Sequence, residues 1–328
     1  MDIRTIGKTP LAVTQFGFGG AAIGGLYREC TQEAAMETLQ TAWDAGMRYF
    51  DTAPFYGFGL SERRTGDFLR SKPRETYVLS TKVGRLLRPV PENQVPDYSY
   101  VNPLPFTVDY DYSYDGIMRA FEFSYARLGL NKIDILYVHD IGVYTHGVEK
   151  NTVYQRQLLD SGMRALDELK TSGAISAYGL GVNEVEVCLD VIARSPIDCI
   201  LLAGRYSLLD RAAERGLLEV CRERKISLVI GGVFNSGILA TGPVPGANFD
   251  YGPASDDILG RVRSMQKIAE ANSIPLAAAA MQFPLREPVV ANVLIGTAKP
   301  SSLTRNMELL KVDVPDSVYA AVEPFTIR

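Results

Sequence analysis

The sequence predicts an α/β fold of the (β/α)8 TIM barrel type, and two observations favour it. Short runs rich in β-branched and aromatic residues alternate with helical patterns along almost the whole chain, as βα units around a parallel sheet require. There are eight such runs, the number of strands that closes this barrel. Because such barrels commonly use this much sequence for one domain, we expect the 328 residues, 1–328, to form a single barrel domain.

The expected strands are short apolar runs, which in chain order cover 13–17, 49–52, 77–82, 133–139, 177–181, 199–202, 227–231 and 293–296. Helical patterns between them predict helices at 31–45, 114–128, 153–171, 185–193, 211–224 and 256–272, with a closing helix at 301–310. Gly46, Gly129 and Gly173 each follow a helical run, where a left-handed C-terminal cap commonly lies. The glycines therefore support the expected helix ends.

Three segments lie outside the repeating units. Residues 1–8 predict a short N-terminal flap, and residues 275–285 predict an extra helix before the last strand. The longest irregular stretch, the loop from Gly84 to Asp111, contains five prolines and four aromatic residues. Because this loop follows the third strand, it should lie on the barrel face that carries active sites. We expect either a substrate lid or a surface insertion there.

Composition and charge narrow the class of protein. Apolar residues make up 46% of the chain and charged residues 22%, which is ordinary for a globular protein with a large core. The formal charge of -4 and the lack of a dense Lys/Arg run predict no nucleic-acid or membrane partner. The N-terminus lacks the apolar core of a secretion signal, and the longest clean apolar run, 276–281, is too short to cross a bilayer. We therefore expect a soluble cytoplasmic protein.

Several familiar catalytic arrangements are missing. Only two histidines occur and no His-Glu-x-x-His pattern, so no metal site is expected. The Gly-x-Ser-x-Gly elbow of α/β hydrolases and the Tyr-x-x-x-Lys pair of short-chain dehydrogenases do not occur either. The four cysteines are dispersed without a Cys-x-x-Cys pair, which predicts reduced, buried thiols.

A glycine-rich segment follows the first expected strand. Residues 17–22, Gly-Phe-Gly-Gly-Ala-Ala, fit the G-x-G-x-x-A pattern of dinucleotide-binding Rossmann folds. That fold places an acidic residue about 20 positions further on, whereas here the acidic strand end, Asp51, comes about thirty positions after Gly20. The alternative is that a glycine strand end lets the backbone approach a bound ligand closely.

Polar side chains end three consecutive strands in the expected barrel. Asp51, Lys82 and His139 each come directly after an apolar run, and a buried charge there is costly unless it is paired. Because neighbouring strands lie about 4.8 Å apart, the three side chains can converge at one rim of a barrel, where Asp51 can reach Lys82.

Tyr56 follows Asp51 by five residues and can fold over this group. A nearby ammonium favours the phenolate, so we expect Lys82 to lower the pKa of Tyr56 and make it a proton donor or acceptor. Each residue alone fits an ordinary role as a buried ion pair, core histidine or loop tyrosine. The occurrence of all four residues at or near three neighbouring strand ends favours a catalytic site.

With these residues in place, the sequence resembles the aldo-keto reductases. The segments that carry the resemblance are FDTAPFYG with SERRTG, LGLNKIDILYVH, YGLGVNE and IGTAKPSSLTRN, which together span nearly the full chain. The resemblance implies a catalytic tetrad of Asp51, Tyr56, Lys82 and His139. It also implies a barrel that binds a nicotinamide cofactor extended over its C-terminal rim, without a Rossmann domain.

The same resemblance implies binding residues. For the cofactor these are Gly20, Asn183, Tyr206, Phe234, Gly296, Thr297, Lys299, Ser302 and Asn306, and for the substrate they are Tyr27 and Phe55. The chain departs from the family pattern after three strands, where it has Gly181 and Val182 before Asn183, then Ala203, and then two glycines at 231–232.

The segment after the last strand bears on the choice of cofactor. Relatives that bind the adenosine 2′-phosphate have a Lys-Ser pair there and an Arg four residues before an Asn. This chain has Gly296 and Thr297 at the pair and Ser302 at the Arg position. A serine cannot neutralise a phosphate, so NAD is expected, with NADP as the alternative because Lys299 can compensate in part.

The run IGGVFNSGILATG resembles the branch of the family that contains D-threo-aldose and pyridoxal dehydrogenases. The function expected from this resemblance is oxidation of the hemiacetal hydroxyl of an aldose to a lactone. The alternatives are a pyridoxal dehydrogenase, an aldehyde reductase that runs the reverse reaction, and a cofactor-sensing binding subunit. The expected partner is a small molecule, whose identity the sequence leaves open together with the oligomeric state.

Overall fold

Eight parallel strands close into a barrel in the computed structural model, which describes residues 1–328. In sequence order the strands are β3 (Phe16–Gly19), β4 (Tyr49–Asp51), β5 (Val78–Val83), β8 (Ile135–His139), β9 (Ala177–Val182), β10 (Cys199–Ala203), β11 (Ser227–Gly231) and β14 (Val290–Ile295). Each strand pairs with the next in this order, and β14 pairs with β3. The predicted barrel is confirmed.

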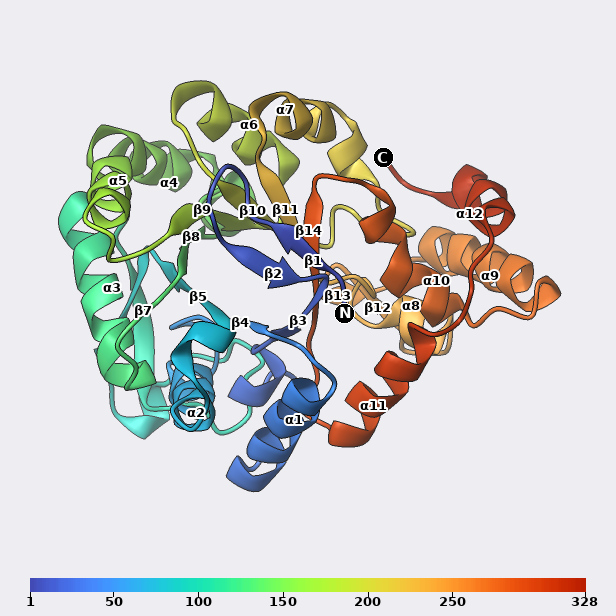
Figure 1. Cartoon of the computed structure of the whole chain (residues 1–328), viewed down its shortest axis with the longest axis horizontal. Helices are drawn as coiled ribbons and strands as arrows, with labels where there is room; N and C mark the ends of the chain where they lie inside the picture. Colours follow the sequence, from blue (N-terminus) through green and yellow to red (C-terminus); the bar gives the residue numbers. More distant parts are fainter.

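Helices surround the barrel on all sides (Figure 1). They are α1 (Gln32–Asp44), α2 (Leu60–Leu69), α3 (Tyr114–Leu128), α4 (Val143–Gln157), α5 (Met163–Thr171), α6 (Val185–Arg194), α7 (Leu217–Arg224), α8 (Ile238–Thr241), α9 (Asp256–Ala271), α10 (Leu276–Gln282), α11 (Pro300–Leu309) and α12 (Asp316–Val322). Thr31, Ser113 and Ser255 cap α1, α3 and α9 by accepting a backbone N–H.

Several helical segments differ from the sequence prediction; among them, the expected helix 211–224 is α-helical only over α7, from Leu217, and the short helix α8 was not predicted. The sequence prediction omits helix α2, because the buried face of this helix carries polar side chains such as Glu62 and Arg64. The helix therefore has no apolar stripe in the sequence. The expected helix 153–171 is the end of α4, a π-helical turn at Leu158–Gly162, and α5. The C-terminal helix α12 was not predicted either.

The N-terminal segment is a hairpin that closes one end of the barrel. Strands β1 (Ile3–Thr5) and β2 (Ala12–Thr14) pair antiparallel, and Ile6 and Val13 pack among the interior side chains of the barrel. In Figure 1 this blue hairpin crosses in front of the barrel strands. The predicted first strand, 13–17, is therefore corrected: its first two residues belong to β2, and the barrel strand is β3.

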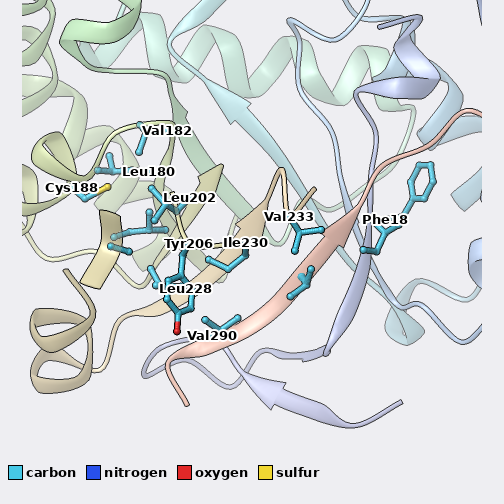
Figure 2. Close-up of a cluster of buried hydrophobic side chains, with 14 of the residues drawn as sticks. Phe18, Leu180, Val182, Cys188, Leu202, Tyr206, Leu228, Ile230, Val233 and Val290 are labelled. Carbon is cyan, nitrogen blue, oxygen red and sulfur yellow. The ribbon is translucent and has the colours of Figure 1, made fainter. Parts of the chain in front are cut away.

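The alternation of side chains along each strand produces two apolar layers. One smaller set, including Tyr49, Tyr137 and Val229, fills the barrel, and a larger set packs between the strands and the surrounding helices. Figure 2 shows part of this outer layer, where Leu202 and Ile230 lie near one another on neighbouring strands. Inward and outward positions alternate along a strand. The inward side chains earlier in each strand therefore determine which residue faces inward at its C-terminal end.

The long segment after β5 is an ordered ribbon. Strands β6 (Arg85–Pro89) and β7 (Phe106–Tyr110) pair antiparallel over their full length. The tip of the ribbon bonds to the loop after β3, where the N–H of Tyr27 donates to Ser99 O (2.7 Å) and that of Val101 donates to Gly25 O (2.9 Å). A second small ribbon, β12 (Asn248–Phe249) with β13 (Gly252–Pro253), follows β11.

Two further observations concern the whole chain. All four cysteines, Cys30, Cys188, Cys199 and Cys221, are buried free thiols, as the sequence predicts. None of the helices combines the length and apolar character that a membrane span requires.

Candidate active site

The inward-facing residues at the C-terminal ends of the strands divide the barrel mouth into two halves. On β4, β5 and β8 these residues are Asp51, Lys82 and His139, each two positions beyond an interior side chain. On or directly after the other strands they are Gly19, Gly181, Ala203, Gly231 and Gly296. The mouth therefore has one half with large polar groups and one half that leaves space for a ligand.

A buried hydrogen-bond network holds the carboxylate of Asp51. Lys82 Nζ donates to Asp51 Oδ2 (2.7 Å) and to the Thr52 carbonyl (3.0 Å), while Ser80 Oγ donates to Asp51 Oδ1 (2.7 Å). The hydroxyl of Tyr49 lies 3.0 Å from Ser80 Oγ and 3.0 Å from the hydroxyl of Tyr137, below the site. Burial raises the pKa of Asp51, and the Lys82 charge and the Ser80 bond oppose that rise.

Tyr56 lies over this ion pair, as the sequence predicts. Lys82 Nζ is 4.6 Å from the centre of the Tyr56 ring, and the rings of Tyr56 and His139 are 5.9 Å apart at 88°. The expected direction of the pKa shift is corrected by the structure. Burial raises the pKa of Tyr56 well above 10, with Asp51 and Asp140 adding to the rise. The ammonium of Lys82 faces a carboxylate at 2.7 Å, which offsets its charge toward the phenol.

His139 is held neutral by its surroundings. Burial lowers its pKa well below 6.5, and the cations Arg85 and Lys82 lower it further. Its Nδ1 is buried and has no hydrogen-bond partner, and its Nε2 lies 3.5 Å from Asp140 Oδ2. A neutral imidazole can hold a substrate oxygen without protonating it.

A cavity of about 510 Å³ opens above these groups, within the range of small-molecule sites. Tyr56, Lys82 and His139 line it, and so do both predicted substrate residues, Tyr27 and Phe55. Further lining residues come from elements distant in sequence: Tyr98 and Tyr100 from the β6–β7 ribbon, Asp140 from the end of β8, and Tyr251 from the β12–β13 ribbon.

Sequence reasoning did not single out several of the groups at this site. Asp140 and Arg85 had a usable signal, since each is a charged residue within three positions of a strand-end catalytic candidate. Tyr100 is one of the four aromatic residues of the loop from Gly84 to Asp111, and its local sequence does not distinguish it from the others. Tyr251 had no local signal, because only the folding of the β12–β13 ribbon brings it to the cavity.

The predicted cofactor residues lie in different parts of the structure. Gly296 and Lys299 are exposed beyond the end of β14, Thr297 accepts the N–H of Lys299 (3.1 Å), and Ser302 and Asn306 are one turn apart on α11. These five residues, Gly296, Thr297, Lys299, Ser302 and Asn306, therefore lie together in the loop after β14 and on α11.

Other predicted cofactor residues lie apart from this cluster. Asn183 lines the cavity above Tyr56, Lys82 and His139, and its carbonyl accepts a hydrogen bond from Arg205 Nε (2.8 Å). Gly20 is buried beside β4, where its N–H donates to Asp51 O (2.8 Å) and an added Cβ would come within 2.6 Å of Ser61 Oγ. Phe234 is half-buried against the outer core.

The prediction for Tyr206 is corrected. Its ring packs 5.3 Å from Phe283 in the outer apolar layer, and it does not line the cavity. Figure 2 shows the ring beside Leu228, among the apolar side chains. The residue lies in a folded-back loop after β10 in which Ser207 and Asp210 hydrogen-bond to each other, and the turn directs the large aromatic ring into the core.

Comparison with known proteins gives consistent results. Residues 15–326 match the Aldo/keto reductase family. A pyridoxal 4-dehydrogenase from Microbacterium luteolum is 44% identical, covering 97% of this chain and 96% of the relative. A D-threo-aldose 1-dehydrogenase from a Pseudomonas species is 37% identical, covering 94% of this chain and 93% of the relative. The holo structure of an aldo-keto reductase from Bacillus halodurans has the same fold, with a TM-score of 0.78 over 100% of this chain and 97% of that chain at 23% identity.

Proposed function

Because the chain belongs to the aldo/keto reductase family and is an oxidoreductase, we propose that it oxidises the hydroxyl group of a small cyclic hemiacetal to a lactone, using a nicotinamide cofactor. The observation that carries the proposal is the meeting of Tyr56, Lys82 and His139 in one cavity of small-molecule size. Two relatives that cover nearly the whole chain are named as dehydrogenases, which supports the oxidative direction.

The arrangement fits a nicotinamide ring. Gly181 faces the cavity next to Lys82, and a Cβ there would come within 3.4 Å of Lys82 Cε and 3.2 Å of Tyr137 Cβ. Ala203 and Gly231 continue this small-residue surface, so a flat ring can lie on it. The cofactor, when bound, accepts the hydride. In our proposal Asn183 borders the ring, while Lys299, Ser302 and Asn306 meet the adenosine end.

The protein residues then handle the proton. In oxidation the hydroxyl proton of the substrate passes to the Tyr56 oxygen, while the hydride leaves the carbon that carries this hydroxyl group. Asp51 keeps Lys82 charged and fixed at 2.7 Å, and Lys82 in turn faces the Tyr56 ring. His139 donates a hydrogen bond to the substrate oxygen and orients it. The aromatic residues over the cavity reduce access of water to this transfer.

The proposed substrate class rests on the names of the two relatives and on the shape of the cavity. Aldoses exist mainly as cyclic hemiacetals, and pyridoxal cyclises in the same way through its hydroxymethyl group, so one reaction serves both. The family resemblance in the sequence favours an aldose as the substrate, with pyridoxal as an alternative. We now place pyridoxal first, because the more similar relative acts on it and because Phe55, Tyr98 and Tyr100 give the cavity flat aromatic walls. A D-threo-aldose is the second candidate.

A substrate panel tests this proposal. Purified enzyme is incubated with pyridoxal, with L-fucose and other aldoses, and with simple aliphatic alcohols, each with NAD and with NADP. Formation of reduced nicotinamide is followed by absorbance, and the product is identified as lactone by mass. We expect turnover of a hemiacetal with lactone as the product. Turnover of simple alcohols alone, or release of an open-chain acid, would contradict the proposal.

A further inference from the structure

A second buried ion pair lies beside the catalytic candidates and has no part in the proton transfer described above. Arg85, at the start of β6, donates through Nη2 to Oδ2 of Asp140, directly after β8. The side chain of Arg85 is 3% exposed and that of Asp140 17% exposed. Removing two charges from water is costly, and such a pair seldom stabilises a fold more than an apolar pair would. Its position at the cavity suggests a role in binding.

The environment of Arg85 fixes the pair in place. Its guanidinium lies 4.1 Å from the centre of the Phe55 ring and 5.4 Å from that of Tyr110, and its Nε is buried without a partner. Asp140 adopts a left-handed backbone conformation (φ 45°), which non-glycine residues seldom adopt, and its N–H donates to Gly181 O (2.8 Å). The carboxylate is therefore held rigidly beside His139.

One oxygen of this carboxylate is free. Oδ2 accepts a hydrogen bond from Arg85 Nη2 and lies 3.5 Å from His139 Nε2, whereas Oδ1 accepts no hydrogen bond from any protein group. Asp140 lines the same cavity as Tyr56 and His139. A carboxylate oxygen in that position can only accept a hydrogen bond, so its natural partner is a hydroxyl donor on the substrate.

We propose that Asp140, held by Arg85, is a specificity-determining residue that accepts a hydrogen bond from a substrate hydroxyl close to the reacting carbon. This inference rests on the proposed function. In a cyclic aldose this hydroxyl is on the carbon next to the hemiacetal carbon, and in pyridoxal it is the ring hydroxyl beside the carbon that carries the aldehyde. An analogue that lacks the hydroxyl leaves a desolvated carboxylate oxygen without a donor, and such sites discriminate strongly.

Matched substrates that differ by one hydroxyl test the inference. The pairs are pyridoxal with 3-deoxypyridoxal, and L-fucose with 2-deoxy-L-fucose. The readout is the ratio of kcat/KM within each pair. For the wild-type protein we expect a ratio of at least about 30 in the pair that it turns over. In Asp140→Asn the ratio should fall about tenfold, because a neutral amide oxygen accepts a weaker hydrogen bond than a carboxylate.

Control variants separate this role from a structural one. Asp109→Asn breaks the exposed Arg88–Asp109 pair on the same ribbon (2.8 Å), and it should leave the ratio unchanged. If Asp140→Asn does not fold, Arg85→Gln/Asp140→Asn removes both charges together and gives the same readout, with folding checked by circular dichroism.

The outcomes distinguish this inference from the proposed function. An equal loss of kcat/KM on both members of a pair would overturn it, since Asp140 would then act through His139 or through the fold. If the wild-type protein turns over no substrate of either pair, this result contradicts the proposed function instead. Dissociation constants of the same pairs, measured by fluorescence quenching, would then decide whether Asp140 recognises the hydroxyl.

Discussion

The ammonium of Lys82 and the carboxylate of Asp51 form an ion pair of 2.7 Å inside the mouth of the barrel, with side chains 2% and 3% exposed. Asp51 ends β4 and Lys82 lies on β5, so the pairing of two adjacent strands sets the contact. Tyr56 lies over the pair and can exchange a proton with a substrate in the cavity, whereas the charged groups of the pair are almost completely buried. This separation leads to distinct predictions for the three residues.

Replacement of Lys82 should affect both stability and turnover. Lys82→Met leaves the Asp51 carboxylate buried without its cation, and loss of one partner of a buried pair costs about 3–5 kcal/mol. Asp51→Asn/Lys82→Met removes both charges and should regain part of the unfolding free energy while turnover stays low. Urea unfolding and steady-state kinetics of the three proteins check this. Equal stability of the single and double variants would contradict it.

Removal of the Tyr56 hydroxyl should abolish most of the proton transfer. We expect Tyr56→Phe to lower kcat at least about 100-fold with little change in cofactor affinity, because the hydroxyl acts on the reacting oxygen. Cofactor binding is measured separately by fluorescence titration. Tyr77→Phe, which changes a tyrosine just before β5, far from the mouth, is the matched control and should keep normal kcat. Near-normal kcat in Tyr56→Phe would remove Tyr56 from the mechanism.

Oxidation should become faster toward alkaline pH. The base is the Tyr56 phenolate, and burial raises the pKa of Tyr56 well above 10, so only a small fraction is deprotonated near neutrality. We therefore expect log kcat/KM for oxidation to rise with pH through about pH 10, with a slope near one. A plateau already present at about pH 8 would mean that the free enzyme lowers this pKa, contrary to the structure.

Acid should destabilise the fold through His146. Burial and the charge of Arg85 lower its pKa from 6.5 to about 4, and its Nε2 lies 2.9 Å from the hydroxyl of Tyr112. The unfolded chain therefore binds a proton that the folded chain does not, so stability is complete above about pH 6.5 and falls as the pH drops toward 4. His146 is half-exposed, so we expect its share to be roughly 1–2 kcal/mol. His146→Gln should lose less stability than wild type between pH 7 and 5 in urea unfolding, and an identical loss would contradict this.

The β6–β7 ribbon should control substrate binding. The ring centre of Tyr98 lies 5.3 Å from that of Phe55, which also lines the cavity, and 6.1 Å from that of the buried Phe58. Tyr98 is nevertheless 44% exposed, so its removal should cost the fold little. We expect Tyr98→Ala to raise KM about three- to tenfold, in line with the loss of an aromatic contact of about 1 kcal/mol, with kcat nearly unchanged. Phe123→Ala, an exposed aromatic on α3, is the control. Equal kinetics in both variants would show that Tyr98 does not meet the substrate.

The α11 region should favour NAD over NADP. Lys299 and Arg305 are exposed without ion-pair partners, and Ser302 lies in the first turn of α11. A serine cannot neutralise the 2′-phosphate, so kcat/KM should be higher with NAD, and Ser302→Arg should raise kcat/KM with NADP about tenfold. Glu308→Gln at the exposed end of α11 serves as the control. A tenfold preference of the wild-type protein for NADP would contradict this prediction.

Prediction from sequence succeeded where the signal is local. Asp51, Lys82 and His139 end apolar runs, and the alternation of a β-strand then requires all three to face the barrel interior. The same local signal failed for α2, whose buried face is polar, and for the segment after β5, whose prolines masked an ordered ribbon.

The sequence by itself determined the number and order of the barrel strands and the polar residues at their ends, because strand periodicity and chain order are properties of neighbouring residues. Only the tertiary structure decided that Tyr206 enters the core, that Tyr251 reaches the cavity, and that Arg85 holds Asp140. It also reversed the expected pKa shift of Tyr56, since burial outweighs a cation that a carboxylate already neutralises. Burial and charge pairing depend on which distant segments the closed barrel brings together, and local spacing along the chain does not contain that information.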